Sequence, residues 1–72
     1  MTESGKNLLL GKMASFGEKQ AVLANIAGLS LSRLNAKLNN YCGAEFTQTE
    51  ISAIKSHYGL NSDEVDAIFF GE

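Results

Sequence analysis

The segment from Gln20 to Asn40 constrains the fold most, because it joins two apolar-periodic stretches through one sharp break. Ala24 is a small residue where two helices could cross closely. Gly28 follows four residues later, where the chain must turn, and Leu34 comes six residues after that. This spacing predicts a helix, a turn of three residues and a second helix.

The rest of the chain carries the same kind of helical signal in short pieces. Leu9, Met13 and Phe16 recur at the spacing of one helix face, and no stretch alternates with a period of two. We therefore expect an all-α fold of five helices around one core, without a sheet. The expected helices cover about 6–16, 18–27, 31–38, 48–58 and 63–70.

Helix ends can also be predicted from the residues. Gly17, Gly28 and Gly59 suit left-handed stops. Ser30 is an N-cap candidate, and Ser62 is another, because a hydroxyl can accept a hydrogen bond from a free backbone N–H. Thr47 and Glu50 have the spacing of a capping box, and Glu18 would lie near the positive end of the second helix.

Length and composition indicate one small domain. The chain has 72 residues, of which 44% are hydrophobic and 19% charged, and it has no proline. We expect a flexible N-terminus at residues 1–5 and one domain over 6–72, with the two-helix motif at about 18–40. The single cysteine, Cys42, cannot form an intrachain disulfide, and no apolar run approaches the roughly 20 residues that span a bilayer. These features favour a cytoplasmic protein without a membrane partner.

The net charge of −2 conceals two unlike halves. Residues 1–44 have five cationic and two acidic side chains, a net charge of +3, whereas residues 45–72 have one cation and six acids, a net charge of −5. The candidate recognition half is thus mildly basic, less so than in most DNA-binding domains. No nucleophile–base pair, phosphate-binding glycine loop or metal-ligand set stands out, so we expect no enzyme, cofactor or metal.

A longer pattern supports a resemblance to a known family. It consists of LS-x-x-x-L-x-x-KLNN over 29–40, then Phe46, then EI-x-x-I over 50–54 and EV-x-x-IFF over 64–70. Over roughly residues 17–70 the chain resembles the lambda-repressor-like, Cro-type helix-turn-helix family of temperate phages. It also looks like the small modulator-of-repression proteins, which are antirepressors encoded beside a phage repressor.

The resemblance implies which residues would meet a partner. In the family, the second helix of the motif enters the DNA major groove. Carried over, the residues that face bases would be Ser30, Leu31, Ser32, Asn35, Ala36 and Asn39. The phosphate contacts would be Lys19, Gln20, Arg33 and Lys37, and Asn40 completes the candidate surface.

Several of these residues allow more than one interpretation. Leu31 could be a core residue with Leu34 and Leu38, an exposed protein contact, or a contact to a thymine methyl. Arg33 and Lys37 lie four residues apart and could form a solvated pair or a functional one. Tyr41 could pack within its loop or lie in an interface.

Two functions are expected from this pattern. In the first, the chain is a phage antirepressor that binds the helix-turn-helix domain of a partner repressor through Ser32, Arg33, Asn35 and Ala36. The alternative is a Cro-like repressor that binds operator DNA as a dimer, and Phe70 could contribute to a homodimer. The second helix of the motif is weakly basic and partly apolar, which favours the antirepressor function.

Overall fold

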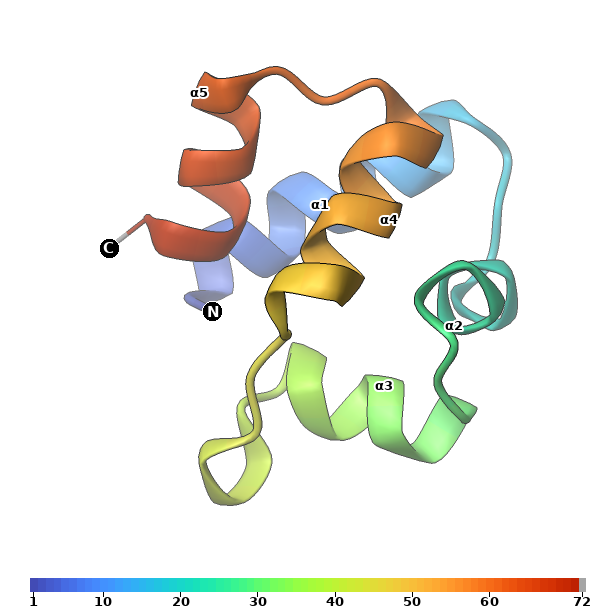
Figure 1. Cartoon of the computed structure of the whole chain (residues 1–72), viewed down its shortest axis with the longest axis vertical. Coiled ribbons are helices and arrows are strands. Elements are labelled where there is room, and N and C mark those ends of the chain that lie inside the picture. The colour runs from blue at the N-terminus through green and yellow to red at the C-terminus, as the bar shows by residue number, and fades with distance from the viewer. Residues whose placement is uncertain (72) are drawn as a thin grey trace.

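The computed structural model describes residues 1–71, and these residues form helices and loops without a strand. Five α-helices and two short helical turns follow one another along the chain (Figure 1). The α-helices are α1 (Glu3–Ser15), α2 (Gln20–Ala27), α3 (Leu31–Leu38), α4 (Gln48–Tyr58) and α5 (Ser62–Val65). The single turn η1 (Tyr41–Gly43) follows α3, and the π-helical turn η2 (Asp66–Phe70) continues α5. The expected all-α architecture of five helices is confirmed.

The core is formed where these helices meet. Its four fully buried large side chains, Leu9, Leu23, Leu34 and Ile54, come from four different helices. Figure 1 shows α4 in the middle of the molecule, where it packs on α2, while α1 packs against η2. The helices α1 to α4 each bury apolar side chains, which is what holds such short helices in place.

Several helix ends follow the predicted signals. Gly28 has a φ of 71° at the end of α2, a left-handed conformation that glycine adopts without steric cost. The Ser30 hydroxyl accepts a hydrogen bond of 3.2 Å from the Arg33 N–H at the start of α3. Thr47 and Glu50 form the predicted capping box of α4. The predicted caps at these three positions are confirmed.

The beginning of the chain differs from the prediction. α1 starts at Glu3, not at Lys6, because the Thr2 hydroxyl accepts a hydrogen bond of 3.0 Å from the Gly5 N–H and caps the helix. Gly5 is buried. The expected boundary between a flexible end at 1–5 and a domain at 6–72 is therefore corrected, since residues 3–5 belong to the first helix.

Two other helix starts are also corrected. α2 begins at Gln20, with Lys19 as its cap, so Glu18 lies outside it. The Glu18 carboxylate instead accepts from the His57 ring at 2.9 Å, which links the turn before α2 to α4. α5 is capped by Asn61, not by Ser62, because the Asn61 side chain and Glu64 form a second capping box.

Candidate recognition surface

The turn between α2 and α3 is short and sharply defined. The Leu29 N–H donates to the Ala24 carbonyl at 2.8 Å, and the left-handed Gly28 ends α2 and lets the chain turn. Ala24 is only 4% exposed, so its small side chain allows close packing on its neighbours. In Figure 1, α3 lies at the edge of the molecule, with one side toward α2 and α4 and the other directed outward.

The outward side of α3 gathers most of the predicted site residues. Leu34, Lys37 and Leu38 are buried, whereas the other residues of α3 are exposed or half-buried. We name this surface the α3 face. Its residues are Ser30, Leu31, Ser32, Arg33, Asn35, Ala36 and Asn39, all exposed except Ala36, which is half-buried.

Leu31 belongs to the α3 face and not to the core. Its side chain is 48% exposed, although Leu34 and Leu38 on the same helix are buried. The reason is its position in the first turn of α3, directly after the loop, where no other helix covers it. The interpretation of Leu31 as a core residue is therefore wrong. A contact to a protein partner and a contact to a thymine methyl remain as interpretations.

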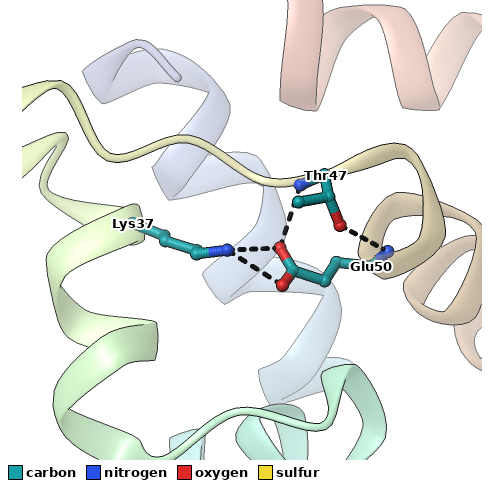
Figure 2. A network of polar contacts seen from close by, with 3 residues as sticks. All are labelled: Lys37, Thr47 and Glu50. Carbon is teal, nitrogen blue, oxygen red and sulfur yellow. Dashed lines mark hydrogen bonds and ion pairs between the residues drawn. The ribbon is translucent and has the colours of Figure 1, made fainter.

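Lys37 is the main correction to the predicted surface. The residue is only 8% exposed, and its ammonium group donates to both Glu50 carboxylate oxygens, at 2.7 and 2.8 Å. Figure 2 shows the Lys37 side chain reaching from α3 to the start of α4, where Thr47 also binds Glu50. Its charge is therefore neutralised inside the protein. Lys37 neither forms a solvated pair with Arg33 nor offers its charge to a phosphate.

Glu50 thus performs two structural tasks at once. Besides binding Lys37, it accepts a hydrogen bond of 2.9 Å from the Thr47 N–H at the start of α4. Burial by itself would raise the pKa of Glu50, but the hydrogen bonds from Lys37 and Thr47 and the Lys37 charge outweigh it, so the pKa lies below its ordinary value of 4.5.

This shift makes stability depend on pH in the acid range. Because the pKa of Glu50 is lower in the folded chain, the unfolded chain binds more protons as the pH falls through 4.5. The Glu50 contribution is present above that pH and is lost below it. Urea unfolding of Glu50→Gln, which keeps the capping hydrogen bond, should show a flatter decline in acid than the wild type. The matched control Glu45→Gln, at an exposed position, should leave the decline unchanged.

The Asn39 side chain is already engaged within the protein. Its Oδ1 accepts from the Lys6 ammonium at 2.7 Å, and its Nδ2 donates to the Asn35 carbonyl at 2.9 Å. Bidentate recognition of adenine would need both of these amide atoms. Asn39 therefore links α1 to the end of α3 through one exposed hydrogen bond. The sequence offered no local signal for this contact, because Lys6 and Asn39 are 33 residues apart.

An open groove runs along the α3 face toward η1. It is lined by Ser32, Asn35, Ala36, Asn39 and Tyr41. Tyr41 is 70% exposed, so packing within its loop is excluded as its role. Tyr41 is absent from the predicted recognition residues. In the sequence, Tyr41 is marked only by being an aromatic residue in a loop with asparagine and glycine, directly after α3.

The remaining predicted residues lie outside α3. Gln20 is half-buried at the first position of α2, and Lys19 before it is exposed. Asn40 is exposed and left-handed, with a φ of 56°, and belongs to the loop after α3. The structure therefore brings the seven residues of the α3 face together and places Gln20 and Asn40 outside that helix.

Known proteins give no further guide to the surface. Comparisons with protein families, curated proteins and solved structures find no match. Within residues 1–71, no three His, Cys, Asp or Glu side chains gather where they could hold a metal ion. Across the same residues, every helix is too short or too polar to cross a membrane.

Proposed function

We propose that α2, the turn and α3 form a helix-turn-helix, and that the protein is a phage-type antirepressor. In this proposal the α3 face binds the helix-turn-helix domain of a phage repressor and covers that repressor's DNA-reading surface. The resemblance described above supports the class of protein. The observation that carries the choice of partner is the chemistry of the α3 face, on which Leu31 is exposed and Lys37 is neutralised.

Charge is the first argument for a protein partner. DNA affinity depends on cations that replace the counterions of the phosphates. The helix α3 lies entirely within residues 1–71 and has two cations. Lys37 is ion-paired, and Arg33 is exposed. Lys19, before α2, adds another exposed cation. Two exposed cations are few for a DNA-binding surface, whereas one arginine beside apolar side chains is typical of protein interfaces.

Apolar surface is the second argument. Leu31 lies at one end of the α3 face, and the groove with Ala36 and Tyr41 lies at the other. Tyrosine and arginine are enriched among the residues that dominate the energy of protein–protein binding, and exposed apolar side chains around them help to exclude water. The exposed Arg33 on the same helix would meet a carboxylate of the partner, since an arginine fork matches a carboxylate in geometry.

Operator binding is the second candidate, and Asn35 favours it. This asparagine is exposed in the middle of α3, and asparagine can bind adenine with both atoms of its amide. A dimer with Arg33 and Lys19 from each subunit would neutralise about four phosphates, so its affinity should fall about 100-fold between 50 and 200 mM salt. The half-sites would lie about 34–36 Å apart.

One titration separates the two functions. The purified protein is titrated with operator DNA of a phage repressor at 50 and 200 mM salt, and then with the helix-turn-helix domain of the same repressor. We expect a stable heterodimer with the repressor domain and no sequence-specific DNA binding. Nanomolar operator binding that weakens steeply with salt, together with no heterodimer, would end the antirepressor proposal.

Leu31→Gln should weaken repressor binding without unfolding the protein. Loss of one well-packed aliphatic contact is expected to reduce affinity by about 5- to 30-fold, corresponding to about 1–2 kcal/mol. Circular dichroism should be unchanged, because Leu31 is already 48% exposed. Leu8→Gln is the matched control, since Leu8 is also 48% exposed but lies on α1. Equal losses in both variants, measured by calorimetry, would argue against the α3 face.

A further inference from the structure

A second concave surface lies between α1 and the C-terminal turns, away from α3. In Figure 1, α5 and its continuation lie beside α1, at the opposite end of the molecule from α3. Leu8, Lys12, Asp63, Glu64, Ala67 and Ile68 line a groove there. Its volume, about 250 Å³, is below the roughly 300–1,000 Å³ typical of small-molecule pockets. The groove suits one or two side chains of a protein partner better than a metabolite.

The α1 surface beside this groove has several small exposed residues. Leu8 is 48% exposed at its edge, and the exposed residues at the same helical spacing are small: Ser4, Gly11 and Ser15. A Cβ atom added at Gly11 would meet no atom within 4 Å. A partner helix could therefore approach the backbone of α1 closely, with Leu8 packed beside it.

The charges around the groove favour a basic partner. The Lys12 ammonium is held by the Glu64 carboxylate at 3.0 Å, so this pair is neutralised internally. The Asn61 N–H also donates to Glu64, at 3.0 Å, which fixes the carboxylate in place. Asp63 is exposed and forms no ion pair within residues 1–71, so the rim keeps a net negative charge.

We propose that this groove, which we name the α1/α5 groove, binds an amphipathic helix of a second protein. That helix would place an apolar side chain between Leu8 and Ile68 and a lysine or arginine beside Asp63. A second copy of this chain is disfavoured, because it would bring the same negative rim. The α1/α5 groove shares no residue with the α3 face, so the protein would be able to hold two partners at once.

Two synthetic peptides test this proposal on the full chain labelled with ¹⁵N. Both are amphipathic helices with the same leucine stripe, and one has lysines where the other has glutamates. The lysine peptide should shift the amide signals of Leu8, Ala67 and Ile68 and leave those of Arg33 and Asn35 unchanged. The glutamate peptide should bind at least about fivefold more weakly.

Variants make the test specific. Asp63→Lys should weaken binding of the lysine peptide by about five- to tenfold, and Leu8→Ser should remove most of it. Leu31→Ser is the matched control and should bind the peptide normally, which keeps this result separate from the proposed function. Equal binding of both peptides, no shifts, shifts confined to the α3 face, or self-association that Leu8→Ser abolishes would each overturn the proposal.

Discussion

Replacing Lys37 with alanine is expected to lower the free energy of unfolding by about 2–4 kcal/mol, a large part of the stability of so small a domain. The change leaves the Glu50 carboxylate, whose side chain is 12% exposed, without its charged partner (Figure 2). It also removes the link between α3 and the start of α4. An unpaired carboxylate in this position costs more than the ion pair itself contributes.

The double variant Lys37→Met with Glu50→Gln is the matched control. It replaces the ion pair with neutral side chains of similar length, and glutamine keeps the capping bond with Thr47. Urea unfolding should therefore show a much smaller loss for the double variant than for Lys37→Ala. Similar losses in both would mean that packing of the lysine stem, and not its charge, holds α3 in place.

Gly5→Ala is expected to be the most damaging conservative change in α1, with a loss of about 1–3 kcal/mol or more. A Cβ atom at this position would overlap the carbonyl oxygen of Ile68 in η2. That oxygen belongs to the backbone and cannot move aside like a flexible side chain. This overlap could be relieved only if α1 moved away from η2, against which it packs.

Gly11→Ala provides the control within the same helix. The position is exposed and its added Cβ would meet no atom, so alanine should raise stability by about 0.5–1 kcal/mol. Thermal unfolding followed by circular dichroism measures both changes, at roughly 4–8 °C per kcal/mol for a domain of this size. A Gly5→Ala variant as stable as Gly11→Ala would contradict the close packing of α1 on η2.

Local signals predicted most of the helical framework. Leu9 and Met13 are buried as their spacing indicated, and Ser30 and Thr47 cap their helices as expected. These features depend only on residues within about one helical turn of each other, so they can be predicted from the sequence alone. The start of α1 was predicted wrongly because the helix begins before the first strong apolar repeat. The Thr2 hydroxyl caps it there by accepting a hydrogen bond from the Gly5 N–H.

The candidate surface was less predictable, because its chemistry depends on contacts between distant residues. Lys37 resembles a surface cation in the sequence, and only the fold brings Glu50, 13 residues later, to its ammonium group. Asn39 is engaged by Lys6 for the same reason. Leu31 shows the opposite case, since its periodicity suits the core but its place in the first turn of α3 leaves it exposed.

The most direct test of the central proposal is an NMR titration of the ¹⁵N-labelled protein with the unlabelled helix-turn-helix domain of a phage repressor. The proposal predicts that the amide signals of Leu31, Arg33, Asn35 and Tyr41 shift at stoichiometric amounts, and that Arg33→Glu weakens the binding. Unchanged signals on the α3 face in the presence of the repressor domain, together with shifts there on addition of operator DNA, would contradict it.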